Sequence, residues 1–146
     1  MTHLVRDVMT EGVAAVRPDT PLTQTAQVMR DEGIGSVLIV DGGRLLGLLT
    51  DRDITLRVVA EGADPRVIEA GDVCTPDPLY VAPDEETTRV VSLMRRHAVR
   101  RLPVVSEGLP VGVVSLGDLA EHRDPESALA EISRAEPSPG QGTVPS

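Results

Sequence analysis

The sequence predicts a mixed α/β (α+β) fold, in which two β-α-β-β-α repeats pack sheet to sheet with pseudo-twofold symmetry. Three observations predict it: an internal repeat, helix and strand periodicities that recur in both copies, and an interior built from aliphatic residues. Only Tyr80 among the 146 residues is aromatic, so Val, Leu, Ile, Ala and Met have to fill the core. Branched aliphatic residues at this density favour strands packed beneath helices.

The internal repeat is the strongest signal in the chain. A shift of 65 positions aligns residues 7–54 with residues 72–119 without a gap. Such self-similarity indicates a duplicated unit. Identical pairs in this register include Asp7/Asp72, Thr10/Thr75, Pro18/Pro83, Met29/Met94, Gly47/Gly112 and Asp53/Asp118.

Each copy has the order strand, helix, strand, strand, helix. Leu22, Ala26 and Met29 recur at i, i+4 and i+7, which predicts a helix with these three residues on its buried face. Asp41-Gly42-Gly43-Arg44 separates two apolar runs and predicts a hairpin. The expected elements are strand 13–16, helix 22–32, strands 36–40 and 45–50 and helix 51–61, then strand 79–82, helix 86–97, strands 102–105 and 111–115 and helix 116–122.

The expected boundaries follow from the repeat. Repeat 1 covers residues 1–60, a linker covers 61–71, and repeat 2 covers 72–124. Residues 125–146 are expected to form a C-terminal helix and a disordered tail rich in Pro, Gly and Ser. A single repeat of about 50 residues is below the size that builds a comfortable core, so the two copies should share one.

Composition excludes several classes of function. The net charge of −9 argues against a broad DNA-binding surface, because that surface needs a basic face. Cys74 is the only cysteine, so no intramolecular disulfide is possible. We find neither a signal-peptide block nor a run of roughly 18 apolar residues. We therefore expect a cytoplasmic protein that binds neither DNA nor a membrane.

A hydroxyl followed three residues later by a carboxylate marks both expected strand-to-helix junctions. The pairs are Thr50 with Asp53 and Ser115 with Asp118. One interpretation is structural, because this spacing is typical of a capping box. The other is functional, because a helix start binds phosphate and a nearby carboxylate accepts hydrogen bonds from ribose hydroxyls. The residues alone leave both interpretations open.

Arginines gather in one short segment of this acidic chain. Arg95 and Arg96 fall within an expected helix, where a solvated face explains them. Arg100 and Arg101 enter an expected strand, from which a guanidinium could bind phosphate in a bidentate manner. The first copy has Gly35 and Ser36 at the matching positions, so two equivalent clefts are not expected.

No catalytic group of residues emerges, and no metal site is expected. His3, His97 and His122 are scattered along the chain, without the helical spacing that gathers ligands. Cys74 occupies the position that matches Met9, which indicates a packed apolar role.

Four motifs in the chain resemble the CBS domain over residues 7–119. They are Asp-Val-Met-Thr at Asp7, Val-x-Pro-Asp at Val16, His-x-Val-Arg-Arg-Leu-Pro-Val at His97, and Gly-x-x-Thr/Ser-x-x-Asp at Gly47 and Gly112. The chain is also similar to small stand-alone CBS proteins of the actinobacterial hypoxic-response type.

The resemblance implies a non-enzymatic CBS pair (a Bateman module) with two ligand clefts and no required cofactor. Its expected ligand is AMP, ADP, ATP or S-adenosylmethionine, and its expected partners are a second copy in a homodimer and an unknown regulated protein. The alternative is a structural or protein-interaction dimer that binds no ligand. Cleft A is expected to hold Arg100, Arg101, Ser115, Asp118, Leu79, Tyr80 and Val99, and cleft B Thr50, Arg52, Asp53, Ala14, Ala15 and Ile34.

Overall fold

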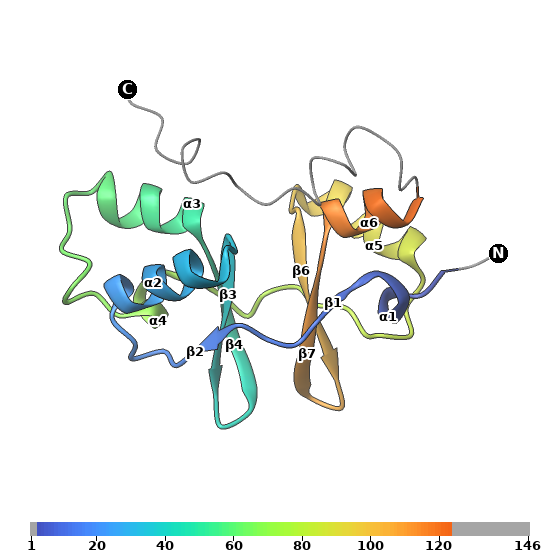
Figure 1. Cartoon of the computed structure of the whole chain (residues 1–146), viewed down its shortest axis with the longest axis horizontal. Helices are drawn as coiled ribbons and strands as arrows, with labels where there is room; N and C mark the ends of the chain where they lie inside the picture. Colours follow the sequence, from blue (N-terminus) through green and yellow to red (C-terminus); the bar gives the residue numbers. More distant parts are fainter. Residues whose placement is uncertain (1–2, 124–146) are drawn as a thin grey trace.

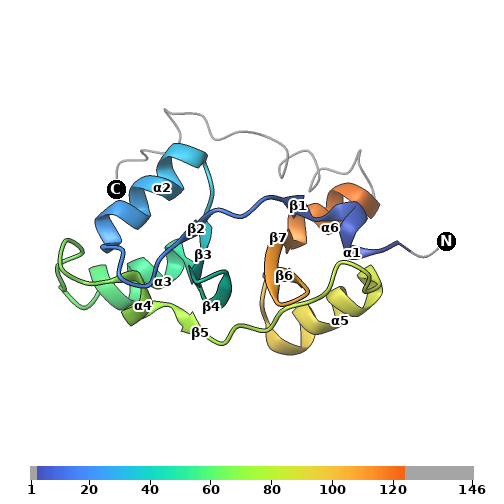
Figure 2. The same ribbon diagram turned by 90° about the horizontal axis from the view of Figure 1, so that it is seen from below.

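Two β-sheets face each other at the centre of the molecule, and the helices cover their outer faces (Figure 1, Figure 2). The computed structural model describes residues 3–123, and the helix and tail expected after residue 124 lie outside the described residues. One sheet has the strand order β2-β3-β4-β5 and the other β1-β7-β6. The predicted fold class and sheet-to-sheet packing are confirmed.

Most elements follow the predicted order, and a short helix and strand that were not predicted open each copy. The helix expected over 51–61 is a short α-helix continued by a π-helical turn. The first copy contains α1 (Val5–Val8), β1 (Thr10–Glu11), β2 (Ala15–Val16), α2 (Leu22–Glu32), β3 (Ser36–Asp41), β4 (Arg44–Thr50), α3 (Asp51–Ile54) and η1 (Thr55–Val59). The second contains α4 (Ala70–Val73), β5 (Thr75–Pro76), α5 (Thr87–His97), β6 (Arg101–Ser106), β7 (Leu109–Ser115) and α6 (Leu116–Arg123).

The strand predicted over 79–82 is wrong. This stretch contributes only an isolated parallel bridge between Val81 and Val104. Pro78 and Pro83 bracket it, and proline has no N–H to donate to a ladder. The corresponding strand of the first copy, β2, pairs with β3 over two residues.

The two hairpins repeat each other residue by residue. Ser36 pairs with Thr50 in the first copy, and Arg101 pairs with Ser115 in the second. A bulge interrupts the first ladder between residues 39 and 40 and the second between residues 104 and 105. Residues that are 65 positions apart therefore match in structure as well as in sequence.

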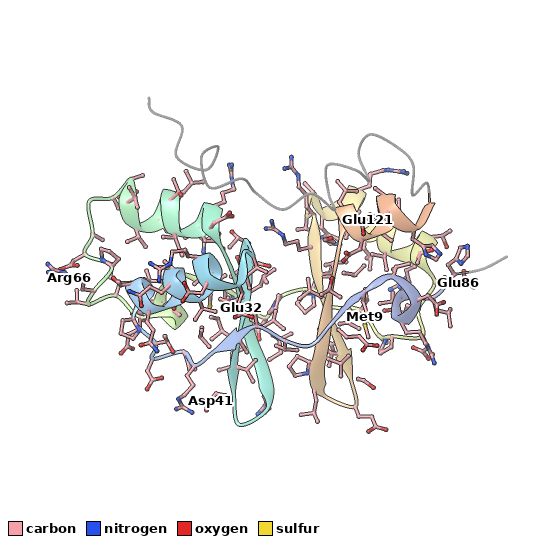
Figure 3. All side chains as sticks on the ribbon, in the orientation of Figure 1. Met9, Glu32, Asp41, Arg66, Glu86 and Glu121 are labelled. Carbon is pink, nitrogen blue, oxygen red and sulfur yellow. The ribbon has the colours of Figure 1, made fainter. Side chains whose placement is uncertain are left out.

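The segment that opens each copy packs on the other copy. Strand β1 pairs with β7, and β5 pairs with β4. Val5 is fully buried in the core of the second copy, and Ala70 is fully buried in the core of the first. Figure 3 shows Met9 on the β6–β7 side of the molecule, although in the sequence Met9 belongs to the first copy. Residues 5–11 and 70–76 are called the exchanged segments below.

Helix α2 buries a different stripe from the predicted one. Leu22 and Met29 are buried as expected, but Ala26 is exposed and Thr25 is fully buried in its place. The Thr25 hydroxyl donates to the carbonyl oxygen of Pro21 at 3.1 Å, which removes the cost of burying it. Within residues 3–123, no helix has both the length and the apolar character needed to cross a bilayer.

The exchange predicts a strict need for glycine at two matching positions. A Cβ on Gly112 would overlap the backbone carbonyl oxygen of Thr10 in β1, and one on Gly47 would lie 2.5 Å from Cys74 Sγ. We expect Gly112→Ala to lower the free energy of unfolding by about 1–3 kcal/mol, because backbone has to move. Thermal denaturation should show a drop of about 2–4 °C per kcal/mol.

The matched control is Gly35→Ala. There the added Cβ would meet only the ends of the Arg101 and Asp51 side chains, which can rotate away. This variant should melt close to the wild type. If Gly112→Ala is no less stable than Gly35→Ala, the exchanged strand does not constrain position 112.

Candidate functional site

A cavity of about 700 Å³ opens between the two sheets, where β4 passes into α3 and β6 begins. A volume of this size lies within the range of small-molecule sites. The wall draws on both repeats and on the chain that follows β5. Its lining residues are Leu48, Thr50, Asp51, Arg52, Asp53, Thr75, Pro78, Leu79, Ala98, Val99, Arg100, Arg101 and Leu102.

The junction of β4 and α3 is a complete capping box. The Asp53 N–H donates to Thr50 Oγ1 at 3.1 Å, and the Thr50 N–H donates to Asp53 Oδ2 at 2.9 Å. The structural interpretation of this pattern is therefore correct. The capping box uses only the Oδ2 oxygen of Asp53. The other carboxylate oxygen, Oδ1, lies 3.9 Å from the Arg57 guanidinium. The Asp53 side chain is 16% exposed and lines the cavity.

The matching junction of β7 and α6 is capped in the same way but differs at the second oxygen. The Asp118 N–H donates to Ser115 Oγ at 3.0 Å, and the Ser115 N–H donates to Asp118 Oδ2 at 2.9 Å. Asp118 Oδ1 accepts a hydrogen bond from the Thr10 hydroxyl at 3.4 Å. The exchanged β1 strand thus contacts the carboxylate in this half.

Three arginines give the cavity its positive character. Arg52, Arg100 and Arg101 line it beside two aspartates, in a chain of net charge −9. None of the three forms an ion pair with a carboxylate of residues 3–123. Arg101 reaches across to the first repeat, where a Cβ on Gly35 would lie 2.9 Å from its Nη2 atom. Gly35 therefore supplies the space that this guanidinium occupies.

Most of the apolar part of the wall comes from the second repeat and the chain before it, and Leu48 adds to it from the first repeat. Helix α5 ends at Ala98 in the left-handed conformation (φ 54°), the position held by Gly33 in the first copy. This turn carries Val99 into the cavity wall. Leu79, 39% exposed, and Pro78 add further apolar surface.

The structure regroups the predicted site residues. The cavity brings Thr50, Arg52 and Asp53 of expected cleft B together with Leu79, Val99, Arg100 and Arg101 of expected cleft A. Tyr80, Ser115, Asp118, Ala14, Ala15 and Ile34 are not among its lining residues. The facing sheets place the strand-to-helix junction of one repeat against the helix-to-strand junction of the other, which the expected grouping did not foresee.

Sequence reasoning missed several lining residues, among them Leu48 and Thr75. Two signals were available for them. Alternation along β4 places Leu48 on the same face as Thr50. Thr75 matches Thr10 in the repeat, but its position beside β4 follows only from the exchange.

A second cavity, of about 450 Å³, lies between α5 and the start of α6. Its lining residues are Val91, Met94, Arg95, Ala98, Val99, Arg100 and Leu116.

Two of the histidines that are scattered along the chain meet in the fold. The rings of His3 and His122 stack edge to face with centroids 4.2 Å apart. The exchange brings them together, because His3 leads into α1 and Val5 beside α6. Within residues 3–123, no group of three or more His, Cys, Asp or Glu side chains is arranged to hold a metal ion.

The packed role predicted for Cys74 is confirmed. Its side chain is partly buried against the first core, and Sγ donates to the carbonyl oxygen of Gly71 at 3.6 Å. Burial raises the pKa of the Cys74 thiol above its ordinary value.

These features define a tandem module in which two β-α-β-β-α units enclose a ligand-sized cleft. The CBS domain family matches residues 5–60 and 70–124, and the chain belongs to that family. Among its relatives is Hypoxic response protein 1 of Mycobacterium tuberculosis, 40% identical over 135 residues, which cover 92% of this chain and 94% of the relative.

Solved structures agree with the fold. The crystal structure of Hypoxic Response Protein I with two coordinated zinc ions matches with a TM-score of 0.75 at 40% identity, over 82% of this chain and 98% of that one. The CBS domain pair of protein MJ0100, in complex with 5′-methylthioadenosine and S-adenosyl-L-methionine, matches with a TM-score of 0.78 at 21% identity, over 87% and 100% of the two chains, and supports the fold.

The raised pKa of Cys74 predicts a pH-dependent stability. Above the ordinary thiol pKa the folded protein retains a proton that the unfolded chain releases, so the free energy of unfolding falls as the pH rises. Denaturant unfolding between about pH 8 and pH 10 should show this fall in the wild type, and Cys74→Ala should reduce it. Parallel pH profiles for the two proteins would contradict the prediction.

Proposed function

We propose that this protein is a regulatory sensor that binds an adenine nucleotide in the cavity between its repeats. The observation that carries the proposal is the meeting of three arginines with the Asp53 carboxylate, one oxygen of which the capping box leaves unused. An anionic, sugar-bearing ligand complements both groups.

The chemistry of the wall supports a nucleotide part by part. Arg100, Arg101 and Arg52 suit a phosphate, because guanidinium binds phosphate oxygens in a bidentate manner. Asp53 Oδ1 suits the paired hydroxyls of ribose, as an acid does in dinucleotide folds. Leu79 and Val99 offer the apolar surface against which a base packs.

The charges favour AMP, ADP or ATP over S-adenosylmethionine. Arginines outnumber aspartates along the wall, and S-adenosylmethionine carries a sulfonium cation in place of phosphate. Like charges at short range in a partly buried site oppose binding. We therefore rank phosphate-bearing nucleotides first.

A sensing role fits a wall drawn from both repeats. A ligand that contacts the two repeats together stabilises one relative arrangement of them, which is how a binding module reports to a homodimer partner or a regulated protein. The described lining contains neither His nor Cys, and the Thr50 hydroxyl beside Asp53 accepts the Asp53 N–H in the capping box. A binding role without catalysis is therefore the function we favour.

The alternative is a scaffold that binds no ligand. The complete capping boxes at Thr50 and Ser115 favour it, because they give both aspartates a structural role. Ligand titrations separate the two functions.

Calorimetric titration with AMP, ATP and S-adenosylmethionine tests the proposal. We expect the two nucleotides to bind more tightly than S-adenosylmethionine, and Asp53→Asn to weaken nucleotide binding about tenfold or more, since a hydrogen bond to a charged acceptor is lost. Asn still accepts the Thr50 N–H, so the cap remains.

Asp118→Asn is the matched control. It changes the equivalent carboxylate in the other capping box, which does not line the cavity. Equal loss of affinity in both variants would contradict the assignment of the nucleotide to this cavity. A wild-type protein that binds none of the three ligands would favour the scaffold.

Removal of Arg100 tests the phosphate contact. We expect Arg100→Ala to weaken AMP binding about tenfold and to make the remaining affinity less sensitive to salt, because screening acts on the lost charge pair. Arg96→Ala, an exposed position on α5 outside the cavity lining, should leave both unchanged. Titration of the two variants at low and high ionic strength measures the difference, and equal salt sensitivity would argue against a phosphate at Arg100.

A further inference from the structure

Arg57 lies between the cavity and an exchanged segment. Its Nη1 atom donates to the carbonyl oxygens of Val73 at 2.8 Å and Cys74 at 3.4 Å. Its Nη2 atom lies 3.9 Å from Asp53 Oδ1, the carboxylate oxygen that the capping box leaves unused. One guanidinium therefore contacts both the proposed ribose acceptor and the end of α4.

The π-helical turn η1 carries this residue. The Ala60 N–H donates to the carbonyl oxygen of Thr55 at 2.9 Å, a bond that spans five residues. The Thr55 hydroxyl donates a second hydrogen bond to the Asp51 carbonyl, at 3.1 Å, in addition to the Thr55 N–H. Short π-helical turns inside helices occur frequently at functional sites.

The carbonyls that Arg57 binds end a very short helix. Helix α4 spans only Ala70–Val73, and the last carbonyls of a helix lack partners within it. Strand β5 follows at once, pairs with β4 through Leu48↔Thr75, and leads into Pro78 of the cavity wall. Arg57 thus holds the segment that forms one side of the cavity.

The matching position in the second repeat faces the residues that lead into the other exchanged segment. A shift of 65 positions from Arg57 leads to His122, whose ring packs against His3, two residues before the exchanged segment 5–11. In both halves the residue one turn after the junction aspartate contacts the segment that crossed over or the residues just before it. Only the first half places a permanent cation there, beside a carboxylate that lines the cavity.

We propose that Arg57 is a positioning residue that orients Asp53 toward a ligand's ribose and couples ligand binding to the exchanged segment 70–76. The inference rests on the proposed nucleotide-binding function. In the free protein this half-exposed pair, at 3.9 Å, is weak. A ligand that displaces water from Asp53 strengthens the pair, and by linkage the order of segment 70–76 strengthens ligand binding.

The test compares AMP with 2′,3′-dideoxyadenosine monophosphate, which lacks both ribose hydroxyls. Calorimetry is carried out on the wild type, Arg57→Gln and Arg57→Lys, together with Arg89→Gln. Arg89 forms the same i,i+4 ion pair, with Glu85 at 2.7 Å, on α5 and outside the cavity lining, so it is the matched control. Glutamine retains an N–H donor for the Val73 carbonyl but removes the charge that faces Asp53.

We expect Arg57→Gln to weaken AMP binding about five- to tenfold, within the usual range of coupling between sites, and to leave the dideoxy nucleotide unaffected. Arg57→Lys should recover part of the loss, and Arg89→Gln should match the wild type. Hydrogen exchange should slow at residues 70–76 when the wild type binds AMP, and this slowing should disappear in Arg57→Gln.

The outcomes separate this inference from the proposed function. A wild type that does not bind AMP overturns both. A wild type that binds AMP, with Arg57→Gln unchanged or with equal losses for both nucleotides, overturns the positioning role alone. If circular dichroism shows that Arg57→Gln is unfolded, the affinities of Arg57→Lys decide the question. A loss of affinity for AMP alone supports the positioning role, and equal losses of affinity for both nucleotides overturn it.

Discussion

The exchange of two short segments between the repeats is the constraint on which the rest of the molecule depends. Residues 5–11 complete the second core, and residues 70–76 complete the first. Each exchanged strand lies against a glycine, Gly112 or Gly47, because only a missing Cβ lets the two backbones come so close. Neither repeat keeps its full core without the other, so two similar units form one folded structure.

The cavity follows from this arrangement. The facing sheets set the β4–α3 junction of one repeat against the start of β6 in the other, and the exchanged segment closes the side through Thr75. Arg101 crosses toward Gly35, the position that matches Arg100 in the repeat, and brings its positive charge to the first half. Any molecule that fills the cavity therefore contacts both repeats, and its binding free energy acts on their relative position.

A carboxylate has two oxygens, so one side chain can cap a helix with one and leave the other for a further contact. Asp53 uses Oδ2 for the helix cap, its Oδ1 faces Arg57, and the residue lines the cavity. Asp118 uses Oδ2 in the same way, but its Oδ1 accepts the Thr10 hydroxyl of the exchanged strand. Equal motifs thus leave unequal groups for a ligand, and the two halves of the molecule are not equivalent.

The sequence by itself determined the duplication, the fold class, helices α2 and α5 and both hairpins, because periodicity and turn chemistry are local. It did not separate Thr25 from Ala26 on α2, since a hydroxyl that bonds its own helix is as easily buried as a methyl group. Only the tertiary structure decided which copy each opening segment joins, that His3 meets His122, and which residues share the cavity. Those outcomes depend on contacts between residues distant in the chain, and no local pattern encodes them.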